Sequence, residues 1–305
     1  MDDAGACGLE PMLVVTGPTG NVGADIITAL TSAAAPPPYR IAAHHPDQLR
    51  DHFGPELPIV PFAFDDRATW PAALDGATTL FLLFPLPHPR TARTWMVPFV
   101  EVAAEAGVEH VVYVTVPGAD RSRLVPHHAV ERAIAASAME HTFLRCAYFS
   151  QNLVRALSTH GVDIADRSEV FVPARRSLTT FLDARDVADA VLRIVGDRAR
   201  HAGRSYLLTG PEALTFEQVA EILTSVLARP IRYADPSVVQ FWRRLRRRGV
   251  SRDTVAFMEL VYRLARRGSN APRSDDLAEL LDRAPRTFRQ FATENRWRWE
   301  QRAWT

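Results

Sequence analysis

The sequence predicts an α/β fold in which a doubly wound parallel sheet carries a smaller, mostly helical C-terminal domain. Three observations predict it. Short apolar runs typical of buried strands alternate with segments of helical spacing through the first half of the chain. A glycine-rich turn follows the first of these runs, and from Pro236 onward the chain is basic and helical in pattern, with no strand signal.

The composition is that of a globular protein and excludes several function classes. The 305 residues are enough for one large domain, or for one with a smaller companion. A formal net charge of +1 predicts no general attraction to nucleic acid or to an anionic membrane. All 36 residues counted as lysine or arginine are arginine. Residues 1–10 are expected to be a flexible tail, and the longest apolar run, Leu80–Phe84, is too short to span a bilayer.

The two cysteines, Cys7 and Cys146, fit neither a disulfide framework nor a metal-ligand spacing. We therefore expect no metal site and a reducing, cytoplasmic setting.

The first half of the chain alternates strand and helix. Helices are expected after Gly23 and over Thr69–Leu74, Thr91–Ala106 and Val130–Ala138. Right-handed crossovers of this kind favour a doubly wound sheet. The predicted strands are Met12–Thr16, Tyr39–Ala43, Ile59–Phe64, Thr79–Phe84, His110–Val116 and Thr142–Arg145.

The second half is less regular. A helix is expected over Asp186–Val195, and Thr215 with Gln218 forms a capping box that opens a helix running to about Leu227. Short strands are expected at Val170–Val172, Thr179–Leu182, Ser205–Thr209 and Ile231–Tyr233.

The strongest motif is the turn from Thr16 to Gly23, whose glycines are spaced G-x-x-G-x-x-G between a strand and a helix. Gly17 allows the tight turn, Gly20 lets the backbone approach a pyrophosphate, and Gly23 lets the helix pack on the strand. The backbone of Thr19, Asn21 and Val22 lies where the helix N-terminus offers a partial positive charge to phosphate. The alternative is a plain glycine-rich turn without a ligand, but the strand–turn–helix context favours dinucleotide binding.

This loop and the segments that follow resemble the NmrA-like branch of the atypical short-chain dehydrogenase/reductase superfamily. The resemblance covers nearly the whole chain and implies a Rossmann-type domain that prefers NADP (NADPH), with NAD as a second option. It also implies a small substrate domain, so we assign residues 11–155 and 178–210 to the NAD(P)-binding domain and 156–177 and 211–305 to the substrate-binding or lid region. The matching segments are Phe64–Leu83, His110–Asp120, Pro126–Ala136, Phe143–Asn152, Leu182–Ala188 and Leu208–Glu212.

Several cofactor positions depart from the family pattern. His44, followed by His45, stands where relatives carry an arginine for the 2′-phosphate, and a protonated imidazole binds phosphate more weakly than a guanidinium. Ala63 stands where relatives place an aspartate near the adenine, with Asp65 as a substitute nearby. Phe84 and Pro85 make the loop beside the cofactor apolar.

Because lysine is absent, the Tyr–Lys pair of ordinary superfamily members is impossible here. Tyr262 with Arg266 has the spacing, but it lies in the C-terminal helices, where a stacked structural pair is expected. The position of the lost lysine falls at His127 or His128, which could act as acid, base or hydrogen-bond donor. The alternative is a solvated pair at a helix start.

Two further residues are candidates for catalysis. Thr115 ends the fifth strand, where it could hydrogen-bond a substrate carbonyl or serve as an ordinary strand residue. Tyr148 follows the sixth strand, at the edge where open α/β sheets bind ligands, and could donate a proton, stack on an aromatic substrate or merely pack.

Other polar positions are expected to be structural. Arg145 and Asn152 tie their loop to the sheet, and Asp183 and Asp186 cap a helix. The one block of charge, residues 243–248, is interpreted as the solvated face of a lid helix and not as a nucleic-acid patch.

The first functional hypothesis is an NAD(P)H-dependent reductase of a quinone, enone or aromatic carbonyl compound. The alternatives are a non-redox enzyme on the same fold, such as an isomerase, cyclase or dehydratase, and a non-catalytic NAD(P)-sensing protein with a protein partner. We expect a small, aromatic or quinone-like substrate and neither nucleic acid nor a membrane as partner; a homodimer is left open. Turnover of NADPH with a simple quinone separates the first hypothesis from the others.

Overall fold

A computed structural model describes residues 12–85, 91–154, 159–268 and 270–300. The chain forms two compact units. Of the described residues, the first comprises 12–85, 91–144 and 191–205, and the second comprises 145–154, 159–190, 206–268 and 270–300. The predicted boundaries placed residues 178–210 with the nucleotide-binding domain, whereas residues 178–190 and 206–210 belong to the second unit. No described helix is long and apolar enough to cross a membrane.

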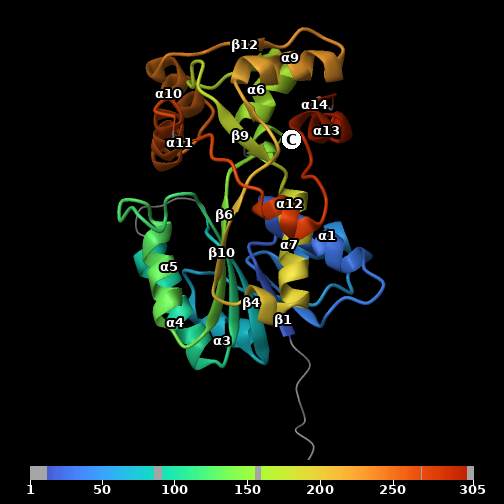
Figure 1. The fold of residues 1–305 in the computed structure, drawn as a ribbon, viewed down its shortest axis with the longest axis vertical. Helices are drawn as coiled ribbons and strands as arrows, with labels where there is room; N and C mark the ends of the chain where they lie inside the picture. The colour runs from blue at the N-terminus through green and yellow to red at the C-terminus, as the bar shows by residue number, and fades with distance from the viewer. Residues whose placement is uncertain (1–11, 86–90, 155–158, 269, 301–305) are drawn as a thin grey trace, which may run out of the picture. The chain divides into compact units, whose positions relative to one another are not determined.

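A seven-stranded parallel sheet forms the centre of the fold, as predicted (Figure 1). Its order is β10-β6-β5-β4-β1-β2-β3, so the chain winds outward from β1 to one edge and then from β4 to the other. The reversal between β1 and β4 is the place where open α/β sheets bind ligands. The strands are β1 (Met12–Thr16), β2 (Tyr39–Ala43), β3 (Ile59–Pro61), β4 (Ala77–Leu83), β5 (His110–Thr115), β6 (Glu140–Cys146) and β10 (Arg204–Leu208).

Helices cover both faces of this sheet. Helices α4 and α5 lie on one side and α1 on the other (Figure 1). The core beneath α3, α4 and α5 is aromatic at its centre, where the rings of Phe62, Phe64 and Trp70 surround Phe99 with centroids 5.1 to 5.3 Å away. The helices are α1 (Asn21–Ser32), α2 (Pro46–Phe53), η1 (Arg67–Thr69), α3 (Trp70–Leu74), the π-helical η2 (Ala92–Met96), α4 (Val97–Glu105), α5 (His127–Ala136), α7 (Ala184–Gly196) and α8 (Arg198–His201).

Two local differences from the sequence expectation have physical causes. The third strand ends at Pro61 and not at Phe64, because the backbone of Ala63 bonds the Thr69 hydroxyl (3.0 Å) and the Trp70 indole (3.0 Å) and turns away from the sheet. Helix α2 gave no periodic signal, because Leu49 is its one buried residue.

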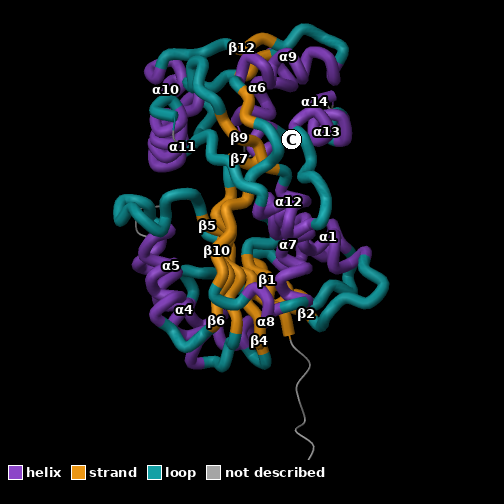
Figure 2. The backbone as a smooth tube through the Cα atoms, in the orientation of Figure 1, coloured by secondary structure: helices purple, strands orange, loops and turns teal. Residues whose placement is uncertain are grey.

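The second unit combines two small sheets with seven helices among the described residues (Figure 2). A three-stranded sheet has the order β11-β9-β7, and β12 pairs with β8. The capping box predicted at Thr215 is present, with both of its hydrogen bonds to Gln218. Its further elements are β7 (Tyr148–Phe149), η3 (Ser150–Leu153), α6 (Thr159–Arg167), β8 (Glu169–Val170), β9 (Thr179–Leu182), β11 (Ala213–Leu214), α9 (Phe216–Leu227), β12 (Arg232–Tyr233), α10 (Val238–Arg247), α11 (Arg252–Ala265), α12 (Asp276–Leu281), α13 (Phe288–Glu294) and α14 (Trp297–Glu300).

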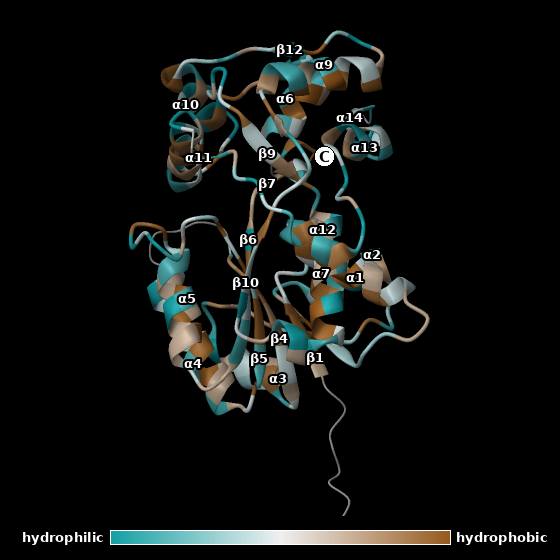
Figure 3. Cartoon of the chain, viewed as in Figure 1, coloured by the Kyte–Doolittle hydropathy of each residue, from teal (hydrophilic) through white to brown (hydrophobic). Residues whose placement is uncertain are grey.

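The core of the second unit is its own cluster of apolar side chains. Phe181 and Phe216 pack edge to face at 5.7 Å, and Phe288 lies 5.0 Å from Phe181. Figure 3 shows helices of this unit with hydrophobic residues on one side and hydrophilic residues on the other, as expected of helices that cover a core.

The start of α7 is held by buried carboxylates, one of which does not cap the helix. Asp183 caps it as predicted, accepting from the Arg185 amide at 3.0 Å. Asp186 was expected to cap as well, but it is fully buried and lies inside the first turn. There it accepts from Arg283 (2.8 Å) and from the amide of Arg286 (2.7 Å), so it ties the helix to the segment before α13.

We expect Asp186→Ala to lower the free energy of unfolding by about 3 kcal/mol, because it leaves two arginines without their buried partner. Urea denaturation measures the loss. Asp189→Ala is the matched control, since Asp189 pairs with the same two arginines from an exposed position and should cost about 1 kcal/mol or less. Equal losses in both variants would show that the burial of Asp186 is unimportant.

Candidate functional site

The turn between β1 and α1 lies at the carboxyl edge of the sheet, beside the ends of β2 and β4. Gly17 has a φ of +63°, which favours glycine, and its carbonyl oxygen accepts the Gly20 amide at 2.8 Å. A Cβ on Gly23 would lie 2.2 Å from that same carbonyl oxygen. Because backbone atoms cannot move aside, a side chain at Gly23 would push α1 away from the turn.

Gly20 is closed in by Leu83, at the end of β4. A Cβ on Gly20 would lie 2.4 Å from Leu83 Cδ2, and one on Gly17 would lie 2.9 Å from the same atom. Thr16 fixes the two strands together, since its hydroxyl donates to the Phe81 carbonyl (3.0 Å) and accepts from the Leu83 amide (3.1 Å). Sequence reasoning gave no role to Leu83 or to Thr16, although Thr16 directly precedes the first glycine of the motif and Leu83 is the last residue of β4.

The turn fits a dinucleotide pyrophosphate. Thr19 is exposed at its tip, whereas the side chain of Val22 is fully buried and anchors the first turn of α1. The first turn contains no acidic residue, so nothing there opposes the partial positive charge of the helix N-terminus. Backbone atoms therefore form the surface of the turn from Gly17 to Gly23, and they can approach a phosphate closely.

His44 and His45 follow β2 directly, both exposed. Their rings meet edge to face at 4.2 Å, and His44 Nδ1 lies 2.9 Å from His45 Nε2. A hydrogen bond between two imidazole nitrogens needs one of them as donor and the other as acceptor. Asp65, the residue expected to replace the adenine-site aspartate, is exposed.

Phe84 links the glycine turn to helix α5. It follows Leu83, is half-buried like Pro85, and stacks on His127 with ring centroids 4.3 Å apart. The Tyr113 hydroxyl lies 2.9 Å from His127 Nδ1. Burial lowers the pKa of His127 to about 3 and raises that of Tyr113, where the charge of Glu131 adds to the effect. His127 is therefore neutral near pH 7 and hydrogen-bonded to Tyr113, so it cannot act as an imidazolium acid.

Glu131 is a buried carboxylate that sequence reasoning missed. The Thr115 hydroxyl donates to it at 2.9 Å, so the proton of Thr115 is already used. His127 and Glu131 are four residues apart on α5, and Tyr113 and Thr115 are two apart on β5, so the two pairs share one helix face and one sheet face. That double spacing is visible in the sequence and could have found Glu131.

His128 is held differently from its neighbour. Its Nδ1 lies 2.7 Å from the Ala119 carbonyl oxygen, which can only accept, so Nδ1 carries the proton. The second nitrogen, Nε2, is not used by this bond. Among the described residues, no group of three His, Cys, Asp or Glu side chains could hold a metal ion.

Tyr148 lies in the core of the second unit. Its hydroxyl is 3.0 Å from that of Tyr262, which in turn lies 2.6 Å from His160 Nε2. Burial, with the charge of Arg248, lowers the pKa of His160 to about 4, and burial raises the pKa of Tyr148 to about 12. The three groups thus form one buried chain of hydrogen bonds, in which the Tyr148 hydroxyl is bonded to that of Tyr262.

This triad replaces the stacked pair expected of Tyr262 with Arg266. Tyr262 faces the core and is 2% exposed, whereas Arg266 lies at the end of the helix and is half-buried. Asn152, expected to tie down its loop, belongs to the surroundings of Tyr148 and interacts with its hydroxyl.

A model of the NmrA-like family matches residues 10–249. The chain belongs to the NmrA-like family. It is thus an atypical member of the short-chain dehydrogenase/reductase superfamily with the NAD(P)-binding Rossmann fold, as the sequence motifs indicated.

Several relatives are similar over nearly the full chain. The (4-alkanoyl-5-oxo-2,5-dihydrofuran-3-yl)methyl phosphate reductase of Streptomyces griseus is 30% identical over 294 residues, 93% of this chain and 98% of that protein. The NAD(P)H azoreductase of Xenophilus azovorans is 26% identical over 291 residues, 92% and 96% of the two chains. Relatives of this NmrA-like chain therefore include NAD(P)H-dependent reductases.

The fold of the chain is also similar to that of a solved reductase. The Citrobacter sp. triphenylmethane reductase complexed with NADP(H) superposes with a TM-score of 0.79 at 20% identity, over 93% of this chain and 99% of that one.

The neutral state of His127 predicts a pH dependence of stability. Its folded pKa of about 3 lies below its ordinary value of 6.5, so the unfolded chain takes up a proton that the folded chain does not. The contribution of neutral His127 to the free energy of unfolding is fully present above pH 6.5 and is lost as the pH falls toward 3. Between about pH 4 and 6, His127→Gln should reduce the slope of unfolding free energy against pH by about 1.4 kcal/mol per unit. Denaturant unfolding at several pH values measures the slope, and an unchanged slope would mean that the ring is charged in the fold.

Proposed function

We propose that the chain is an NAD(P)H-dependent reductase of a quinone, an enone or a related aromatic carbonyl compound. The observation that carries the proposal is the β1–α1 turn, which leaves no room for a side chain at Gly20 or Gly23 and so exposes backbone where a pyrophosphate binds. Its position at the reversal point of the sheet supports the same assignment.

The residues that would hold the dinucleotide belong to the first unit. The backbone from Gly17 to Gly23 would bind the pyrophosphate, and His44 with His45 would bind the 2′-phosphate of NADP. Asp65 would lie toward the adenine. Phe84 and Pro85 would form the apolar wall of the cofactor loop. When bound, the reduced cofactor supplies a hydride.

Of the four candidate catalytic residues, His128 is the best placed to hold a transferable proton. His127 is neutral and bonded to Tyr113, Thr115 donates to Glu131, and the Tyr148 hydroxyl is bonded to Tyr262. His128 instead has its Nδ1 proton fixed on Ala119, so in its imidazolium form it would donate the Nε2 proton to the reduced substrate. Thr115 has its proton on Glu131 and so offers none to a substrate carbonyl.

The apolar surroundings support an extended, conjugated substrate. The stacked rings of Phe84 and His127 offer flat surfaces of the kind on which aromatic compounds pack. The named reductases among the relatives and solved structures include an azoreductase, a reductase of triphenylmethane dyes and a reductase of an oxo-dihydrofuran, names that all indicate conjugated substrates. We infer the same class of acceptor for this chain.

NADPH binding should depend on the glycine turn. Gly20→Asp places a side chain against Leu83 and a negative charge at the pyrophosphate position, so we expect affinity for NADPH to fall about 100-fold or more. Isothermal titration calorimetry measures it, with circular dichroism as a check on folding. Gly196→Asp is the matched control, since a Cβ there meets nothing within 4 Å. Equal affinity for NADPH in the wild type and in Gly20→Asp would show that the turn is not part of the cofactor site.

Turnover tests the reductase itself. We expect NADPH oxidation with 1,4-benzoquinone, and a fall in kcat of about 10- to 100-fold in His128→Ala, because water partly replaces a general acid. Tyr148→Phe should cost about tenfold or less, since its hydroxyl is buried and bonded to that of Tyr262. NADPH affinity, measured separately, should be nearly unchanged in both.

Two outcomes would contradict this account. Complete loss of activity in Tyr148→Phe, with normal NADPH binding, would make Tyr148 the dedicated acid. Wild-type protein that binds NADPH but oxidises none with any quinone or enone would favour the sensor or the non-redox enzyme.

A further inference from the structure

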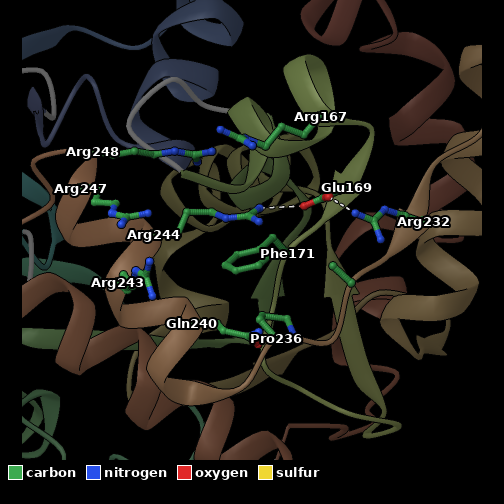
Figure 4. A pocket seen from close by; sticks show the side chains of 11 residues that line it. Arg167, Glu169, Phe171, Arg232, Pro236, Gln240, Arg243, Arg244, Arg247 and Arg248 are labelled. Atoms are coloured by element: carbon green, nitrogen blue, oxygen red, sulfur yellow. Dashed lines mark hydrogen bonds and ion pairs between the residues drawn. The ribbon is translucent and has the colours of Figure 1, made fainter.

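A cavity of about 600 Å³ lies in the second unit, away from every residue assigned above (Figure 4). This volume is within the range of small-molecule sites. Guanidinium groups make up most of its lining. They come from α6, β12, α10 and the residue that caps α10 at its C-terminus. These six residues are Arg167, Arg232, Arg243, Arg244, Arg247 and Arg248.

Helix α10 supplies the largest share of the lining through one face. Gln240, Arg243, Arg244, Arg247 and Arg248 follow one another at steps of three, one, three and one residues, which places them on the same side of a helix. The opposite side carries the buried Phe241 and Leu245, which pack into the core. The helix is therefore held by its apolar side, and its arginine side is turned to the cavity.

Two of these arginines are anchors. Arg248 forms a two-pronged pair with the fully buried Asp163, at 2.5 and 2.9 Å. Arg244 bridges Asp163 (2.9 Å) and Glu169 (2.8 Å). Burial alone would raise the pKa of Glu169, but the hydrogen bonds and charges of Arg244 and Arg232 outweigh it and lower that pKa. Glu169 is thus charged, and the ion pairs of the two carboxylates fix the inner wall of the cavity.

The remaining positive charge is not compensated. Arg243 and Arg247 are exposed, and within residues 12–85, 91–154, 159–268 and 270–300 neither has a hydrogen bond or an acidic partner. Among the described residues, the ion pairs of the six arginines are with Glu169 and Asp163, which leaves a surplus of four positive charges. The whole chain has a net charge of +1, so this surplus is concentrated locally.

The cavity also has an apolar part. The guanidinium of Arg244 covers Phe171 at 3.4 Å from the ring centroid, and Ala234 and Pro236 complete the lining beside it. Figure 4 shows Arg243 and Arg247 to one side of Phe171 and Arg232 to the other. A ligand that matches both parts has an anionic head and a small apolar body.

We propose that this cavity binds a small phosphate monoester. Guanidinium forks pair with the oxygens of phosphate two at a time, and several converging forks match a tetrahedral dianion better than a flat carboxylate. Anchored Arg244 and Arg248 form the rigid side of the site, and unpaired Arg243 and Arg247 supply the donors that close on the head group. The body of the ester packs beside Phe171 and Pro236.

The test is calorimetric binding of phenyl phosphate, with inorganic phosphate and phenol as partial probes. We expect phenyl phosphate to bind more tightly than inorganic phosphate, and phenol not to bind. Arg243→Gln/Arg247→Gln should lower the affinity for phenyl phosphate about tenfold or more, because each substitution removes a charge-assisted contact. Arg252→Gln/Arg267→Gln is the matched control, since it removes the same charge from exposed arginines of the same unit outside the cavity.

A second pair of measurements separates this cavity from the dinucleotide turn. Gly20→Asp should bind phenyl phosphate as the wild type does, and saturating NADPH should not displace it. Displacement by NADPH would place the phosphate in the β1–α1 turn and overturn the proposal. An equal loss of affinity for phenyl phosphate in both arginine double variants would show that binding depends on overall charge and not on this cavity. Equal affinity for inorganic phosphate and phenyl phosphate would show that the cavity does not recognise the organic part of an ester. An oligonucleotide that binds while phenyl phosphate does not would overturn it in favour of a nucleic-acid surface.

Discussion

The contact between the Gly17 carbonyl and Gly23 is the constraint on which the first unit depends. It sets how closely α1 approaches β1, and it leaves no room for even a methyl group. Leu83 then closes over Gly17 and Gly20, so the end of β4 is positioned by the same turn. Phe84 follows at once and stacks on His127, whose Nδ1 meets Tyr113. One backbone contact thus orders the end of β4 with Phe84 and the first turn of α5.

Much of this fold could be predicted because its signals are local. The strands at Met12–Thr16, Tyr39–Ala43 and Thr179–Leu182 have the predicted bounds, and the Thr215 capping box is a four-residue pattern that needs no tertiary information. The third strand was predicted too long, because the bonds that turn Ala63 away come from side chains six and seven residues later.

The polar contacts of the candidate site were harder to predict, since most join residues far apart in the sequence. Tyr148 and Tyr262 are 114 residues apart, and Arg244 and Asp163 are 81 apart. The sequence alone showed the arginine block at 243–248 and placed Tyr262 in the C-terminal helices. It did not show which acidic side chains and which rings these residues contact. Glu131 is the exception, because helical spacing from His127 and strand spacing at Tyr113 and Thr115 point to it.

The arginine-only composition has a consequence for the α10 cavity. A guanidinium keeps its proton at any physiological pH, so the walls of this cavity cannot be switched off by titration as a histidine or lysine site could. Glu169, the carboxylate in the wall, has a lowered pKa and so keeps its charge near neutral pH. A dependence of binding on acidity near neutral pH must then come from the ligand. A phosphate ester gains its second negative charge as the pH rises through about 6. Its affinity for the cavity should therefore increase as the pH rises toward 7. A carboxylate, already ionised, would show no such change.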